Sequence, residues 1–171
     1  MDTGSDSPLV DRALLAALDE ALGAVAAAIP WAERDSNRVV WHEGSSATPA
    51  WVPTWATGVC ELFEACAEIE MADVGNGWFV HPLESGPPDD PFVPREVARN
   101  GPCFPLGTDG GGGWFVVGDD GVVWRLPPGL LRDGVYDPAP DQPVEHVASS
   151  VRGFVELMHA LAVEASTCDD E

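Results

Sequence analysis

Trp114-Phe-Val-Val-Gly-Asp-Asp-Gly-Val-Val-Trp-Arg-Leu126 is the stretch of sequence that decides the fold. Its two runs of β-branched and aromatic residues flank Gly118-Asp-Asp-Gly121, a connector that favours a tight turn between antiparallel strands. A similar arrangement occurs earlier, where residues 69–73 alternate apolar with polar or small side chains, Gly75-Asn-Gly77 suits a turn, and Trp78-Phe-Val-His81 returns. The sequence therefore predicts two β-hairpins in the middle of the chain.

Apolar residues at helical spacing lie on both sides of these hairpins. Ser7 followed by Pro8 is a helix-start signal, and the apolar stripe that follows it ends at Pro30, which predicts a first helix over residues 8–29. Ser149 or Ser150 can cap a final helix. The apolar face of that helix consists of Val151, Phe154, Val155, Met158, Leu161 and Ala162.

The segments between these elements are shorter or less regular. Residues 38–42 predict a strand, and the polar residues 44–49 predict a loop after it. Pro53 suits the first turn of a second helix. The face of that helix would carry Trp55, Val59, Leu62, Phe63 and Cys66.

Two long stretches, Glu84 to Cys103 and Pro127 to Val147, are rich in Pro, Gly and Asp and are predicted to be loops, with a single helical turn at Pro94–Arg99. Helices at both ends of the chain around central hairpins predict an α+β fold, a twisted antiparallel sheet flanked by helices. With 171 residues the chain fits one domain, residues 1–171, which ends in a polar, acidic tail over residues 166–171.

The charge of the chain is strongly negative. It has 29 acidic and 8 basic residues, all eight of them arginine, and a formal net charge of −21. Such a field repels phosphate backbones and anionic membrane surfaces, which argues against nucleic acid and membrane partners and favours basic proteins. Solubility alone also explains an acidic surface. The first residues lack the features of a signal peptide, which predicts a cytoplasmic protein.

No motif in the sequence predicts a cofactor, a metal or a catalytic group. Asp109-Gly-Gly-Gly-Gly113 lacks the Lys and Ser or Thr of a phosphate-binding loop, and its glycines instead predict a hairpin entry where backbones approach closely. The acidic pairs lack calcium-loop spacing, and the four histidines are scattered. Cys60, Cys66, Cys103 and Cys168 are predicted to be reduced thiols, two of them on a helix face.

Two segments of the chain carry the motifs of a known family. The first is Val52-Pro-Thr-Trp-Ala-Thr-Gly-Val-Cys-Glu-Leu-Phe-Glu-Ala65, followed by Gly77-Trp-Phe-Val-His-Pro-Leu-Glu84, and it resembles the SMI1/KNR4 (SUKH) family of bacterial immunity proteins. The second begins with Phe104-Pro-Leu-Gly-Thr-Asp109, continues through the glycines and the hairpin, and is followed by a Phe-containing last helix. The resemblance covers roughly residues 50–165, which leaves the first helix and strand, residues 1–49, outside it.

The resemblance implies a non-catalytic domain that binds a protein, in bacteria often a secreted toxin, and an acidic surface would suit a basic, nuclease-type toxin. We expect the partner to contact acidic residues in the long loop and at hairpin turns, namely Asp89, Asp90, Asp109, Asp119 and Asp120. Two alternatives remain from the sequence: a regulatory scaffold without a toxin, and a small hydrolase that uses paired carboxylates.

Overall fold

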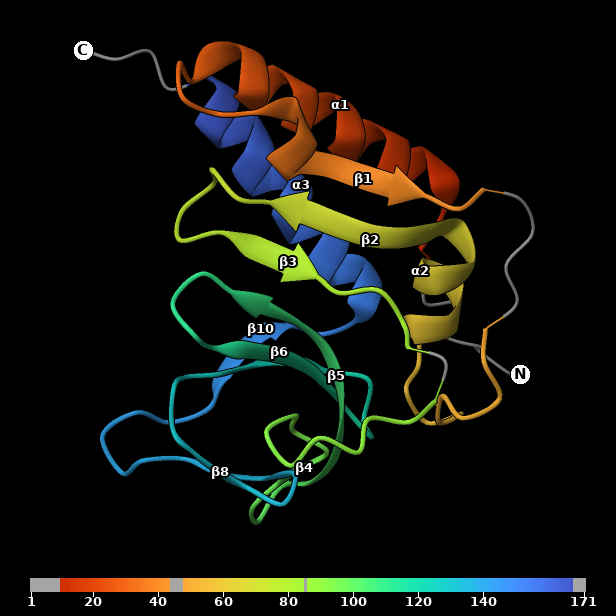
Figure 1. Cartoon of the computed structure of the whole chain (residues 1–171), viewed down its shortest axis with the longest axis vertical. Helices are drawn as coiled ribbons and strands as arrows, with labels where there is room; N and C mark the ends of the chain where they lie inside the picture. The colour runs from red at the N-terminus through yellow and green to blue at the C-terminus, as the bar shows by residue number, and fades with distance from the viewer. Residues whose placement is uncertain (1–9, 44–47, 85, 168–171) are drawn as a thin grey trace, which may run out of the picture.

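The computed structural model describes residues 10–43, 48–84 and 86–167 (Figure 1). These residues form a mixture of helices and largely antiparallel strands, which confirms the predicted α+β fold class. In chain order the elements are α1 (Arg12–Ala28), the short 3-10 turn η1 (Arg34–Ser36), β1 (Asn37–Trp41), α2 (Val59–Ala65), β2 (Cys66–Met71), β3 (Trp78–Val80), β4 (Glu96–Val97), β5 (Gly101–Asp109), β6 (Trp114–Gly118), β7 (Val123–Leu126), β8 (Leu130–Arg132), β9 (Val135–Asp137), β10 (Glu145–Ala148) and α3 (Val151–Thr167).

The strands form a main sheet and a smaller branch. The main sheet is antiparallel and runs in the order β1-β2-β3-β5-β6-β7-β10. The branch runs in the order β5-β4-β9-β8 and contains one parallel pair, β4 with β9. Figure 1 shows α1 and α3 beside β1, β2 and β3, whereas β4 and β8 lie at the other end of the molecule. Strand β5 belongs to both sheets.

Strand β5 changes its neighbour halfway along its length. Residues 107–109 pair with β3, whereas Gly101 and Pro102 pair with β4. Pro105 lies between these two parts, has no backbone N–H to donate, and stands next to a shift of register with β6. The two sheets therefore separate along residues 104–106, and we call this place the β5 fork.

The two faces of β6 bury side chains in different cores, because successive residues of a strand point to opposite faces. Phe115 and Val117 belong to the large core beneath α1 and α3. Val116, between them, belongs to a small core on the other face with Val97, Cys103, Leu126 and Tyr136. The hairpin of β6 and β7 is thus covered on both faces.

Side chains of α1 and η1 bind part of the outer edge of β1. The Asp19 carboxylate on α1 accepts from the Val39 amide at 2.8 Å and from the Arg34 guanidinium at 2.9 Å. Arg34 also donates to the carbonyl oxygen of Asn37. Edge strands with free backbone groups invite pairing with other chains, and these contacts satisfy part of this edge internally.

The first helix is shorter than predicted at its N-terminus. It begins at Arg12, and the Asp11 side chain caps it by accepting from the Leu14 amide at 2.8 Å. Val10 and Leu15 are both buried at this end, where a hydrophobic contact across the cap favours a helix start. Ser7 and Pro8 lie outside the described residues.

The prediction that the second helix starts near Pro53 was wrong. Helix α2 begins at Val59, because Gly58 before it has a φ of +86°, which is not a helical conformation. Gly58 also stands so close to Val151 that any side chain at this position would collide with it. Cys60 and Cys66 are the two thiols that this helix was expected to carry, but Cys66 is the first residue of β2, so only Cys60 lies on a helix.

The prediction of two long loops was also wrong in part. The first stretch contains β4 and the start of β5, and residues 94–99 form β4 and a turn instead of a helical turn. The second contains β8, β9 and most of β10. These strands have two to four residues, apart from β5, and so few residues show no clear alternation.

The two hairpins, the first strand and the last helix are confirmed, whereas residues 44–47 of the predicted loop lie outside the described residues. β2 pairs with β3, and β6 pairs with β7, as the two hairpins required. The strand predicted at residues 38–42 is β1. Ser150 caps α3 by accepting from the Gly153 amide at 3.0 Å, and α3 continues through Ser166 and Thr167, the start of the predicted tail. The rest of that tail lies outside the described residues.

Candidate partner-binding groove

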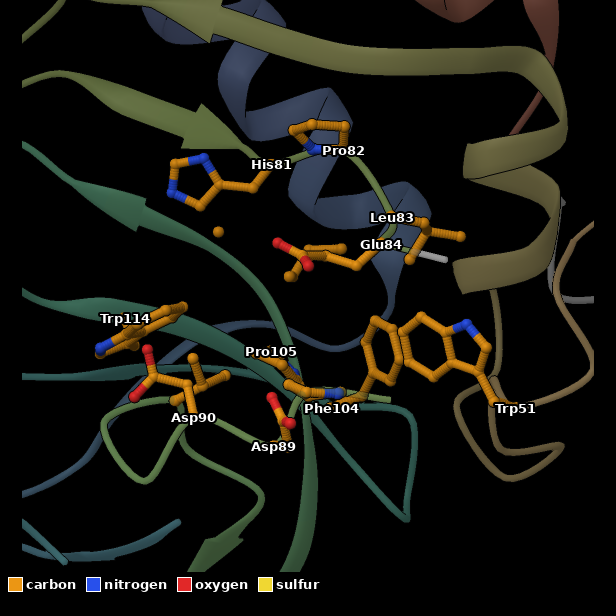
Figure 2. Close-up of a pocket in the computed structure, with 14 residues that line it drawn as sticks. Trp51, His81, Pro82, Leu83, Glu84, Asp89, Asp90, Phe104, Pro105 and Trp114 are labelled. Atoms are coloured by element: carbon orange, nitrogen blue, oxygen red, sulfur yellow. The ribbon is translucent and has the colours of Figure 1, made fainter. Parts of the chain in front are cut away.

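A hollow of about 370 Å³ opens at the β5 fork. Its walls come from the segment that follows β3, from the loop before β4, from β5 and β6, and from Trp51 in the segment before α2. Figure 2 shows the hollow with its lining side chains. We call this hollow the groove and define it by three acidic residues, three aromatic residues and one histidine: Glu84, Asp89, Asp90, Trp51, Phe104, Trp114 and His81.

Three aromatic rings and the His81 ring line part of the groove. The Trp51 and Phe104 rings stack with their centroids 5.9 Å apart and their planes 22° from parallel. The Trp114 and His81 rings meet edge to face, with centroids 6.5 Å apart. Phe104 is buried, whereas Trp51 and Trp114 are half-buried and keep part of their surface toward solvent. Aromatic rings in such positions often anchor protein interfaces.

Three carboxylates project into the same space. In Figure 2 Glu84 approaches from the segment after β3, and Asp89 and Asp90 approach from the loop on the opposite side. One Asp90 oxygen accepts from the Phe92 amide at 2.8 Å, which holds the turn of the loop. The groove lining includes no arginine, and within residues 10–43, 48–84 and 86–167 none of these carboxylates forms an ion pair. The groove therefore carries uncompensated negative charge.

His81 adds no positive charge to the groove near neutral pH. Neighbouring protein atoms partly desolvate the exposed ring and so lower its pKa below the ordinary value, although the charge of Glu68 opposes part of that shift. The Nε2 atom of His81 lies 2.8 Å from the Thr108 hydroxyl on β5. This contact positions the His81 ring beside the β5 fork, where it meets the Trp114 ring edge to face.

Asp109, one of the five acidic residues selected from the sequence, serves the structure internally. Its side chain is only 7% exposed. One carboxylate oxygen accepts from the amides of Gly111 and Gly113 at 2.8 Å each, and the other accepts from Arg125 Nε at 2.6 Å. Burial would raise the pKa of Asp109, but the bonds from Gly113, Arg125 and Gly111 together lower it.

We expect the Asp109→Asn variant to lose about 1 to 3 kcal/mol of unfolding free energy at pH 7, because the Arg125 guanidinium loses the nearer of its two charged partners, Asp109 and Glu145. A lowered folded-state pKa contributes stability above the pKa of the unfolded chain, about 3.9, and that contribution disappears as the pH falls through the folded value. Urea unfolding at pH 7 and at pH 3 should show the difference between wild type and variant shrinking in acid.

The control for this measurement is Asp119→Asn, an exposed turn residue, which should change the unfolding free energy by less than about 0.5 kcal/mol. A difference between wild type and Asp109→Asn that stays the same at pH 3 would contradict the ion-pair explanation.

The five selected residues do not form one surface. Asp89 and Asp90 line the groove, whereas Asp119 and Asp120 lie exposed at the turn between β6 and β7 and line a second hollow of about 360 Å³. The second hollow contains Arg99, so its charge is partly balanced. The Asp120 carboxylate also accepts from the Val122 amide at 3.0 Å, which fits a turn-forming role.

Sequence reasoning missed most of the groove. Its lining residues come from separate stretches of the chain, around Trp51, His81–Glu84 and Phe104, and no pattern in these stretches indicates that they meet. The one local signal was Pro105, because a proline within a strand indicates an edge or a bulge. The predicted close approach at the glycine run is confirmed, since a Cβ on Gly110 would lie 1.9 Å from the Asn76 carbonyl oxygen.

Two of the cysteines predicted to be reduced, Cys66 and Cys103, are buried. Burial raises the pKa of the Cys66 and Cys103 thiols to about 12, which leaves them protonated at neutral pH. Cys60, Cys66 and Cys103 form no disulfide, and Cys168 lies outside the described residues. None of the described helices is long and apolar enough to cross a membrane.

Comparisons of this chain with protein-family models, with curated proteins and with solved structures found no match.

Proposed function

We propose that this chain is a non-catalytic binding domain of the cytoplasm that neutralises a basic protein, as an immunity protein neutralises its toxin, and that the groove is its recognition surface. The observation that carries the proposal is the convergence of Glu84, Asp89 and Asp90 on one aromatic-lined hollow, in which the described part of the chain places no arginine. Carboxylates that share one hollow favour a cationic partner, which compensates their charge.

The net charge supports the same proposal at longer range. A chain with a formal charge of −21 attracts a basic protein before contact and so speeds association. A toxin that acts on nucleic acid would offer the cationic groups that such a groove can cover. The SMI1/KNR4 resemblance of the segments around α2, β3, β5 and β6 adds weight to an immunity role.

Phe92 offers exposed apolar surface in the same loop as Asp89 and Asp90. Its side chain is 70% exposed, and its amide is held by Asp90, one of the groove carboxylates. Exposed aromatic residues next to complementary charge are typical anchors of protein interfaces. The loop before β4 can therefore contribute both charge and apolar area to one partner.

The first experiment is co-purification of this chain with the product of the neighbouring gene, followed by measurement of the association rate at several salt concentrations. The triple variant Glu84→Gln, Asp89→Asn, Asp90→Asn should lower the association rate at low salt by about 10-fold, because local steering is lost. The salt dependence of the rate should also flatten.

The matched control removes three charges elsewhere, through Glu20→Gln, Glu64→Gln and Glu164→Gln, all exposed residues outside the groove lining. Its association rate should stay close to that of the wild type. Replacing Asp119 and Asp120 with Arg tests the other hollow in the same assay. A larger effect at that turn than in the groove would place the partner on the other hollow.

The same complex separates the alternatives drawn from the sequence. A co-purified protein without toxic activity would favour the scaffold alternative. A protein that is chemically processed in the complex, with processing lost in the groove triple variant, would favour the hydrolase alternative. Rescue of cells from a toxic partner by the wild-type chain, and not by the triple variant, is the result we expect.

A further inference from the structure

We infer that the groove accepts an arginine side chain of the partner and distinguishes arginine from lysine at equal charge. This inference rests on the proposed function, because it names the group that the partner presents. It depends on the combination of flat aromatic wall and separated carboxylates that lines the hollow, and not on the acidic residues alone.

The arrangement of the groove carboxylates does not suit a metal ion. Three carboxylates line the hollow, but no group of three Asp, Glu, His or Cys in the described part of the chain is arranged to hold a metal ion. A metal ion needs several oxygens within a short distance of one point. A guanidinium is broad and planar, and its five donors reach acceptors on different sides.

The aromatic wall favours guanidinium over ammonium. Trp114 is half-buried and lines the hollow together with Asp90, so a side chain that enters can contact a ring and a carboxylate at once. A guanidinium is weakly hydrated and stacks on aromatic faces, whereas an ammonium keeps its water more strongly. The hollow of about 370 Å³ has room for such a side chain.

Arginine already fills comparable places within this chain. The Arg12 guanidinium carbon lies 4.8 Å from the centre of the Trp41 ring. Arg125 bridges two carboxylates from different strands, Asp109 at 2.6 Å and Glu145 at 3.1 Å. The groove offers both kinds of contact together, and within the described residues no arginine of the chain occupies it.

The test uses two blocked pentapeptides of equal charge, Ac-Gly-Arg-Gly-Arg-Gly-amide and its lysine counterpart. Each is titrated into the full ¹⁵N-labelled chain, and binding is followed through the indole N–H signal of Trp114, which a Trp114→Phe variant assigns. We expect the arginine peptide to shift this signal and to bind with a Kd roughly 5-fold lower than that of the lysine peptide. In the triple variant of the groove carboxylates both peptides should lose affinity.

The Trp114→Leu variant should lower the affinity for the arginine peptide to that of the lysine peptide, because charge attraction remains and the ring contact is lost. The comparison of the two peptides on the wild-type chain does not depend on the Trp114→Leu variant, so it stands even if that variant does not fold. Equal affinities, shifts centred on Asp119 and Asp120, or no groove shift with either peptide would each overturn the inference.

The association rates measured with the co-purified partner test the proposed function independently of the peptide titrations. A partner whose association depends on the groove carboxylates, combined with equal peptide affinities, would leave the proposed function standing without the arginine preference. A partner indifferent to the groove carboxylates would remove the proposed recognition surface itself.

Discussion

Replacing Gly107 with alanine is expected to lower the free energy of unfolding by more than about 4 kcal/mol, which is enough to unfold many domains of this size. Gly107 lies in β5 opposite Val80 of β3. A Cβ at this position would lie 1.7 Å from the carbonyl oxygen of Phe79 and 2.7 Å from its carbonyl carbon. Both are backbone atoms, so the clash can be relieved only if β3 and β5 move apart.

The matched control is Gly86→Ala, where an added Cβ would meet nothing within 4 Å. Its unfolding free energy should stay within about 0.5 kcal/mol of the wild type, or rise slightly because alanine restricts the unfolded chain. Urea unfolding followed by tryptophan fluorescence measures both variants. If Gly107→Ala unfolded at the same urea concentration as Gly86→Ala, the close pairing of β3 with β5 would be refuted.

The second large effect is expected from Phe154→Ala, which should cost about 3 to 5 kcal/mol. Phe154 is fully buried on α3, and its ring lies 5.1 Å from that of Phe115 and 5.7 Å from that of Trp78, measured between centroids. Trp78 and Phe115 also stack on each other at 4.7 Å. Removing the Phe154 ring leaves a cavity between α3 and both hairpins, so the cost includes lost burial and lost contacts.

Val163→Ala is the control on the same helix, because Val163 is 41% exposed and alanine suits a helix. It should change the unfolding free energy by less than about 0.5 kcal/mol. Thermal and urea unfolding, together with the near-ultraviolet circular dichroism of the aromatic cluster, compare the two variants. An equal effect of the two substitutions would contradict the role of Phe154 in joining α3 to the sheet.

Local sequence was sufficient for the two hairpins and for α3. Strand residues on either side of Gly118-Asp-Asp-Gly121 leave the chain few alternatives to a tight turn, and the Ser150 cap requires contacts only three residues away. The fold class follows from the order of these elements. Asp109 could be recognised in the sequence as an acidic residue beside glycines. Its pairing with Arg125, which joins β5 to β7, could not be predicted from the sequence.

The β5 fork and the groove depend on contacts between distant segments. β4 has two residues and joins the structure by pairing with β5 and β9, so its own sequence carries no strand signal. Phe104 and Glu84 line one hollow because β5 separates from β3 at Pro105. The sequence therefore determined which residues are acidic or aromatic, and the pairing of the strands decided which of them face one another. A side chain's partners across a sheet depend on strand register, which is set by packing over the whole molecule.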